Sequence, residues 1–138
     1  MMMMTKMMIA AAVLVMTTAC CGQKAVLEGT QWKLAKMEGI PATAIAQDAE
    51  NFTLMLVPEK MSVNGKTNCN RFFGQYKVSG EEVEFENLGM TRMACPDMQY
   101  ENLFVKMLDE TDRYTIKGST LKLYDDKKEI AAFEVMPK

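Results

Sequence analysis

Four cysteines are the most reactive side chains in this 138-residue sequence, which contains no histidine. Histidine is the commonest general base and the commonest transition-metal ligand, so its absence excludes serine–histidine–aspartate catalysis and removes the commonest ligand of metal sites. Cys20 and Cys21 are adjacent, whereas Cys69 and Cys95 stand apart and form no C-x-x-C pair. The sequence therefore offers thiols of two kinds, one near the N-terminus and one in the body of the chain.

The first cysteine follows a segment that is typical of protein export. Residues 1–8 carry one charge, Lys6, residues 9–16 are apolar, and Thr17-Thr18-Ala19 precede Cys20. An apolar run of this length is too short to span a bilayer but is typical of a signal peptide. Small residues before a cysteine resemble the lipobox of bacterial lipoproteins, in which the cysteine thiol receives a diacylglyceryl group and a peptidase then cuts before it.

We therefore predict a lipoprotein signal peptide at residues 1–19, lipidation of Cys20, a tether at residues 20–25 and one domain at residues 26–138. The lipid would hold the protein on a membrane. No Asp follows Cys20 to retain it at the inner membrane, a rule borrowed from other lipoproteins, so we expect the outer membrane, facing the periplasm. The alternative is an ordinary secretory signal peptide, with Cys20 and Cys21 as plain cysteines.

Cys69 and Cys95 are the two remaining cysteines. An exported protein folds in an oxidising compartment, where two cysteines usually pair, so we predict a structural disulfide. Closing a loop of this size stabilises the fold by about 3.5 kcal/mol in the chain-entropy model. Free or redox-active thiols are the alternative.

Composition narrows the class of partner. The net charge is −2, and no cluster of Lys and Arg occurs, which argues against nucleic acid as a partner. No phosphate-binding loop or dinucleotide fingerprint is present, and we expect no cofactor and no metal.

A period of two dominates the chain after residue 25, and it predicts short strands. The predicted strands are residues 32–37, 52–57, 61–63, 72–78, 83–88, 114–116, 121–124 and 130–135. Asn64-Gly65 reads as a turn, and residues 42–49 as a loop or a short helical turn.

One segment, residues 97–110, has helical spacing instead. It places Tyr100, Leu103, Phe104, Met107 and Leu108 on one face, and Pro96 and Asp97 stand where a first turn or cap would be. An antiparallel sheet must cover one face, so the predicted class is α+β: a mainly antiparallel, open or half-closed barrel-like sheet with one amphipathic helix packed against it.

Four ordered motifs carry a family resemblance. They are Leu27-Glu28-Gly29-Thr30-Gln31-Trp32-Lys33-Leu34, Cys69-Asn70-Arg71-Phe72-Phe73-Gly74-Gln75-Tyr76, Thr91-Arg92-Met93-Ala94-Cys95-Pro96 with Glu101, Phe104 and Leu108 after it, and Tyr114-x-Ile116-x-Gly118-x-x-Leu121-x-Leu123. The chain resembles the META domain family of HslJ-like bacterial lipoproteins over residues 25–135. Asn68 stands where the family usually has glycine, and asparagine is the next best residue at positive φ.

The resemblance implies an antiparallel, open or half-closed barrel with a helix against it, similar in shape to secretin-pilot lipoproteins that hold lipid in a cracked barrel. It also implies links to heat-shock induction, novobiocin tolerance and motility or virulence. It implies no enzymatic activity.

Two groups of residues are candidates for a site. Asn70, Arg71, Thr91 and Arg92 flank the two cysteines and could line an interaction or ligand site, but the interpretation we favour is structural, with Asn70 and Thr91 satisfying backbone groups. Eight methionines follow residue 16, and clustered thioethers could bind Cu(I). Because these methionines are scattered along the chain, we interpret them as core fillers. Trp32 reads as a core residue.

The leading hypothesis is a non-enzymatic envelope lipoprotein that serves stress tolerance or envelope maintenance through contacts with an envelope protein of unknown identity. The alternative is a binding module for a small apolar ligand, such as an acyl chain, between sheet and helix.

Overall fold

The computed structural model describes residues 25–137. The predicted signal peptide, Cys20 and all but the last residue of the predicted tether lie outside the described residues. No helix within residues 25–137 is long and apolar enough to cross a membrane.

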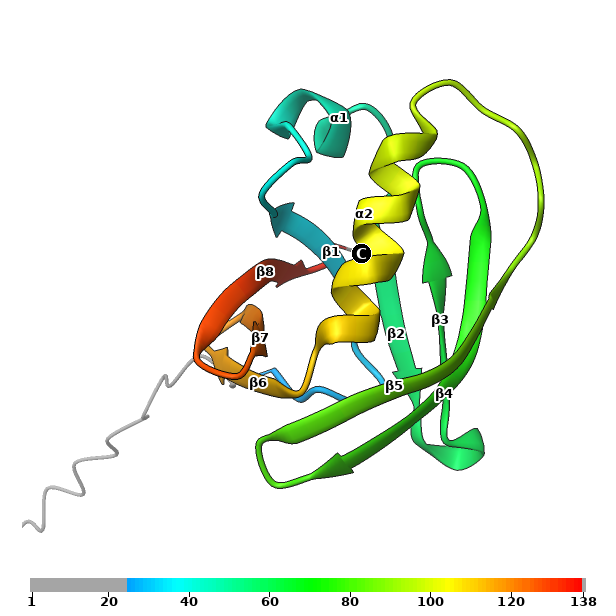
Figure 1. The fold of residues 1–138 in the computed structure, drawn as a ribbon. Coiled ribbons are helices and arrows are strands. Elements are labelled where there is room, and N and C mark those ends of the chain that lie inside the picture. Colours follow the sequence, from blue (N-terminus) through cyan, green and yellow to red (C-terminus); the bar gives the residue numbers. More distant parts are fainter. Residues whose placement is uncertain (1–24, 138) are drawn as a thin grey trace, which may run out of the picture.

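Eight strands, two α-helices and one short 3-10 helix, Pro58–Lys60, make up the described chain (Figure 1). In chain order the strands and α-helices are β1 Gln31–Lys36, α1 Ala42–Ala46, β2 Thr53–Val57, β3 Ser62–Lys66, β4 Arg71–Ser79, β5 Glu82–Met90, α2 Met98–Glu110, β6 Arg113–Lys117, β7 Thr120–Asp125 and β8 Lys128–Val135. All eight predicted strands are present, and so is the long helix. The ambiguous segment at residues 42–49 contains the short helix α1.

The strands form one antiparallel ring in chain order, in which β8 pairs with β1. The strand pairing around the ring is least extensive between β5 and β6. These two strands share the single residue pair Glu82–Arg113 and two further backbone hydrogen bonds beside it. The chain leaves the sheet at the opposite end of β5, after Met90, forms α2, and returns as β6, which begins beside the first residue of β5. Figure 1 shows α2 crossing the ring. The predicted α+β class, a barrel-like antiparallel sheet with one packed helix, is confirmed.

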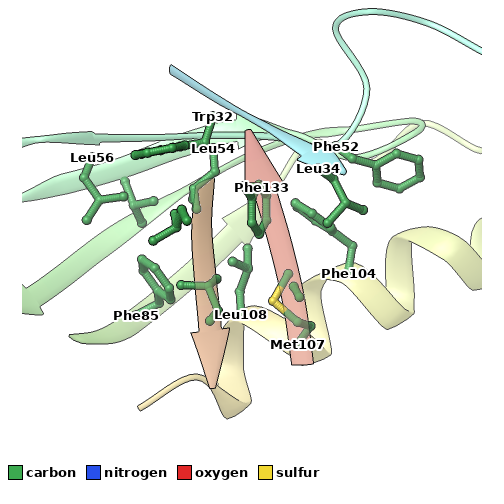
Figure 2. Packing of buried hydrophobic residues seen from close by; sticks show 14 of the residues in the cluster. Trp32, Leu34, Phe52, Leu54, Leu56, Phe85, Phe104, Met107, Leu108 and Phe133 are labelled. Atoms are coloured by element: carbon green, nitrogen blue, oxygen red, sulfur yellow. The ribbon is translucent and has the colours of Figure 1, made fainter. Parts of the chain in front are cut away.

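Aromatic rings from the strands and from α2 meet in the interior (Figure 2). The ring of Phe104 lies 5.5 Å from that of Phe52, 5.8 Å from that of Phe72 and 6.1 Å from that of Phe133. These four side chains are 0–1% exposed. Trp32 is fully buried, and its indole N–H donates to the Leu27 carbonyl, as a core tryptophan requires.

One local prediction was wrong. Asn64 and Gly65 form no turn and lie inside β3, where a Cβ on Gly65 would come within 2.0 Å of the Thr53 carbonyl oxygen. The glycine marks a close approach between strands. Asp97 is at the N-cap position of α2, where a cap was predicted, but it has a φ of 62° and its side chain makes no capping hydrogen bond.

The position of Phe104 predicts its contribution to stability. Truncation to alanine removes the ring that three other rings contact, so Phe104→Ala should lower the free energy of unfolding by about 3–5 kcal/mol. Phe73→Ala is the matched control, because the Phe73 side chain is 55% exposed and should cost far less. Urea denaturation of both variants measures the difference, and a small loss for Phe104→Ala would indicate that its ring borders empty space.

Candidate functional site

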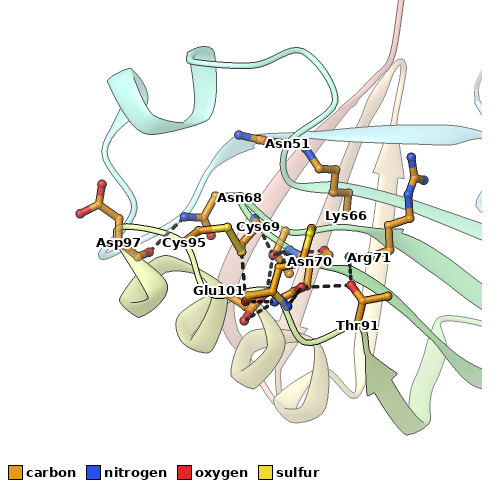
Figure 3. Close-up of a disulfide and its surroundings, with 12 residues drawn as sticks. Asn51, Lys66, Asn68, Cys69, Asn70, Arg71, Thr91, Cys95, Asp97 and Glu101 are labelled. Carbon is orange, nitrogen blue, oxygen red and sulfur yellow. Dashed lines mark hydrogen bonds between the residues drawn. A yellow bond between two sulfur atoms is a disulfide. The ribbon is translucent and has the colours of Figure 1, made fainter.

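The motif residues around the two cysteines come together at one end of the ring (Figure 3). Cys69 and Cys95 form a disulfide with a Cα–Cα distance of 5.9 Å. Cys69 lies in the turn between β3 and β4, and Cys95 lies in the segment that leads from β5 into α2. The bond therefore ties the start of α2 to the sheet.

Asn70 is the centre of a hydrogen-bond network, which we call the Asn70 network: Thr67, Asn70, Thr91, Met93 and Glu101. The side-chain oxygen of Asn70 accepts from the Met93 backbone N–H at 2.7 Å and from the Thr91 hydroxyl at 3.0 Å. Its side-chain nitrogen donates to the Met93 carbonyl at 3.1 Å and to a carboxylate oxygen of Glu101 at 3.3 Å. Asn70 is 2% exposed, so one buried amide holds two chain segments together.

Glu101 supplies the link from this network to α2. Its carboxylate accepts from the Thr67 hydroxyl at 2.7 Å and from the Asn70 backbone N–H at 3.2 Å, and Glu101 is 2% exposed. A buried carboxylate is costly unless hydrogen bonds replace its lost water. We did not predict this role. The signal was present, because Glu101 stands three residues before Phe104 and seven before Leu108, on the apolar face of the helix.

The structure divides the four predicted site residues into two pairs. Asn70 and Thr91 belong to the Asn70 network, and the Thr91 hydroxyl also accepts from the backbone N–H of Arg71 at 3.1 Å. Arg71 and Arg92 are exposed to solvent. Asn70 and Thr91 therefore hold the local architecture, whereas the guanidinium groups are free to meet a partner.

Two exposed apolar side chains lie near these arginines. Phe73 pairs with Gly89 across β4 and β5, and its ring lies 2.9 Å from the position of a Cβ on Gly89, so it covers that glycine. Met93 is 57% exposed. The Thr91 N–H donates to the Arg71 carbonyl at 3.0 Å, which continues the ladder from Phe73 toward Met93. We call Arg71, Phe73, Arg92 and Met93 the arginine face.

The first of the four sequence motifs, which begins at Leu27, makes a contact outside the Asn70 network. The Tyr76 hydroxyl donates to the carboxylate of Glu28, and burial, with this carboxylate beside it, raises the pKa of Tyr76 above its usual value. Burial and the Glu28 charge also raise the pKa of Tyr114. Glu28 thus links the segment before β1 to the barrel through the hydroxyl of Tyr76.

Asn68, which stands where the family usually has glycine, does not have the positive φ that we expected for it. Its side-chain N–H donates instead to the Asp97 carbonyl at 3.0 Å, which connects the β3–β4 turn to the residue before α2.

The methionines only partly follow the core prediction. Met107 is buried at 2% exposure, but Met61 and Met93 are exposed and the others are half-buried. At the β4–β5 turn and the start of β5, the acidic side chains of Glu81, Glu82 and Glu84 are also exposed to solvent.

Fold and site together define a small disulfide-bonded barrel domain, in which eight antiparallel strands enclose the apolar face of one helix and a buried amide network fixes that helix. A sequence profile of the META domain matches residues 25–137, so the chain belongs to the META domain family.

One named relative and several solved structures are similar to this chain. The chain is 31% identical to Heat shock protein HslJ of Escherichia coli (strain K12) over 100 residues, which cover 70% of this chain and 68% of that protein. An NMR structure of a protein from Burkholderia xenovorans is similar with a TM-score of 0.65 and 25% identity, over 81% of this chain and 85% of that chain. A crystal structure of a DUF4847 family protein from Bacteroides vulgatus, 15% identical, shares the fold, with a TM-score of 0.59 over 82% of this chain and 97% of that chain.

The disulfide should contribute measurably to stability. Replacing both Cys69 and Cys95 by alanine releases the loop between them, 26 residues in sequence separation, and should lower the free energy of unfolding by about 3.5 kcal/mol. Urea denaturation of the double variant checks this value. Treatment of the wild type with a thiol reductant should give a similar loss, and an unchanged midpoint in both experiments would contradict the stabilising role.

Proposed function

We propose that this protein is a non-enzymatic, lipid-anchored protein of the bacterial cell envelope, which acts in heat-shock or antibiotic stress tolerance by contacting another envelope protein. The stress role rests on membership of the META family and on similarity to a relative named as a heat shock protein. The anchor rests on the lipobox-like sequence before Cys20.

One observation carries the proposal of a contact role. The polar side chains of the central motifs are occupied in holding the fold: the cysteines in their disulfide, and Asn70, Thr91 and Glu101 in mutual hydrogen bonds. The same motifs leave the arginine face exposed, with two guanidinium groups beside two large apolar side chains. Arginine and aromatic side chains are enriched at protein interfaces, and exposed apolar groups favour a partner over solvent.

The point where the chain leaves the domain toward the proposed anchor is consistent with an arginine face that is accessible to a partner. The Ala25 N–H donates to the Gly118 carbonyl at 3.0 Å, which fixes the start of the domain at the β6–β7 turn. Four residues lie between Cys20 and Ala25, and the five steps of the chain from Cys20 to Ala25 reach at most about 17 Å. Figure 1 shows the β6–β7 hairpin and the segment that leads from β5 to α2 at opposite sides of the molecule. A lipid on Cys20 would therefore place the arginine face away from the membrane.

The packing weighs against the acyl-chain alternative. The side chains of Phe104, Phe52, Phe72 and Phe133 pack together inside the strand barrel. A lipid held inside the barrel would have to lie in the space that they fill.

Lipidation of Cys20 gives the first test. The mature N-terminus should be a diacylglyceryl-modified Cys20, and Cys20→Ala should leave the protein uncleaved or release it from the membrane fraction. Mass spectrometry of the purified protein, with Cys21→Ala as the control that keeps the lipid, decides the question. An unmodified terminus at another residue would overturn the anchor.

Contact through the arginine face gives the second test. A photo-crosslinking phenylalanine analogue at position 73 or 92 should form one common adduct with an envelope protein in heat-shocked cells, while the analogue at Lys127, exposed in the turn between β7 and β8, should not. Arg71→Glu combined with Arg92→Glu should abolish both the adduct and the stress tolerance without changing the melting temperature. The proposal fails if all three positions react alike, or if the double variant tolerates stress as the wild type does.

A further inference from the structure

Three methionines within one nine-residue stretch of the chain line one surface hollow, which we call the methionine hollow. It has a volume of about 480 Å³ and lies between the end of β5, residues 91–94 and the first turn of α2. Met90, Met93 and Met98 line it, together with Asn70, Leu88, Gly89, Thr91, Arg92, Ala94 and Glu101. Met90 and Met98 are half-buried, and Met93 is exposed.

The chemistry of these side chains selects one class of ion. A thioether is a neutral, polarisable ligand that carries no proton to lose, and it prefers soft cations such as Cu(I) over Zn²⁺, Mg²⁺ or Ca²⁺. The neighbouring Cys95 is held in the disulfide and offers no thiolate. Within residues 25–137, no group of three histidine, cysteine, aspartate or glutamate residues is placed to hold a metal. The thioethers are therefore the distinctive ligands of this hollow.

The three methionines are carried by backbone that is already fixed. The N–H and the carbonyl of Met93 are both hydrogen-bonded to the side chain of Asn70. Met90 is the last residue of β5, where it pairs with Phe72, and Met98 is the first residue of α2. The disulfide at Cys95 ties the segment between Met93 and Met98 to the sheet. Little backbone order would be lost on binding, which favours affinity.

The charges around the hollow are compatible with a cation. The carboxylate of Glu101 lies beneath it and accepts three hydrogen bonds, all of them from neutral donors. The opposing charge is Arg92, whose side chain is exposed and can turn toward solvent. We propose that the methionine hollow binds one soft monovalent cation, Cu(I), through the thioether sulfurs of Met90, Met93 and Met98.

Silver provides a redox-stable probe, because Ag(I) shares the charge and softness of Cu(I) and leaves the disulfide intact. The detergent-solubilised mature protein, with Cys21→Ser to remove a competing thiol and with ¹³C-labelled methionine methyl groups, would be titrated with silver nitrate in chloride-free buffer. We expect saturation at one equivalent, with shifts of the Met90, Met93 and Met98 signals and none at Met61 or Met107. Zinc should shift none of them.

Leucine variants connect the signals to affinity, since Met→Leu conserves volume and costs little stability. Met90→Leu, Met93→Leu and Met98→Leu should each weaken Ag(I) binding at least tenfold, and the triple variant should not bind. Met61→Leu, at an exposed methionine elsewhere, should bind as the parent does. Anaerobic competition with a Cu(I) chelator, without thiol reductant, should repeat this order for Cu(I). No shift at one equivalent, uniform shifts of exposed methionines, or equal effects of Met61→Leu and Met93→Leu would overturn the proposal.

Discussion

The fixed position of α2 across the ring is the constraint on which the rest of the structure depends. β5 and β6 share one residue pair, so the sheet alone closes its ring weakly at this point. α2 lies in the chain between those two strands and fills the interior with Phe104, Met107 and Leu108. The segment that leads into α2 is tied to the β3–β4 turn by the Cys69–Cys95 disulfide, and Glu101, in the first turn of the helix, accepts hydrogen bonds from Thr67 and Asn70. Apolar burial therefore provides the driving force for docking, and the polar contacts fix the register.

This constraint explains why the motif residues divide as they do. Asn70 is buried at the junction between sheet and helix, where an unpaired polar group would be costly, and the Thr91 hydroxyl donates to its side-chain oxygen. Arg71 and Arg92 are the immediate neighbours of these two residues in sequence, and both are exposed. A rigid junction thus presents charged and apolar side chains at fixed positions on its outer surface. The proposed contacts of the arginine face and the proposed cation site both use this rigidity, and they share Met93: its side chain is part of the arginine face, and its thioether sulfur is one of the proposed ligands.

The spacing of apolar residues along the sequence was enough to predict the strands and the long helix. Strands that bury one face alternate apolar and polar residues, as in Val83-Glu84-Phe85, and α2 has helical spacing. Contacts between distant segments could not be predicted, because they are set by the packing of the whole chain. Gly65 resembled a turn residue, but it is required where β2 and Phe72 approach. Glu101 gave a signal as a charge on an apolar face, but its partners lie more than 30 residues away. Met90, Met93 and Met98 looked scattered until the fold placed them around one hollow.

Asn70 and Glu101 act together to fix α2 on the sheet. A double-mutant cycle of Asn70→Ala and Glu101→Ala, with unfolding free energies from urea denaturation, measures that coupling directly. Either single variant already breaks the contact, so the losses should be non-additive, with a coupling energy of about 0.5–3 kcal/mol. Hydrogen exchange of α2 should rise in each variant, while that of β7 and β8 changes little. Two losses that add within about 0.3–0.5 kcal/mol, with protection of α2 unchanged, would contradict the account.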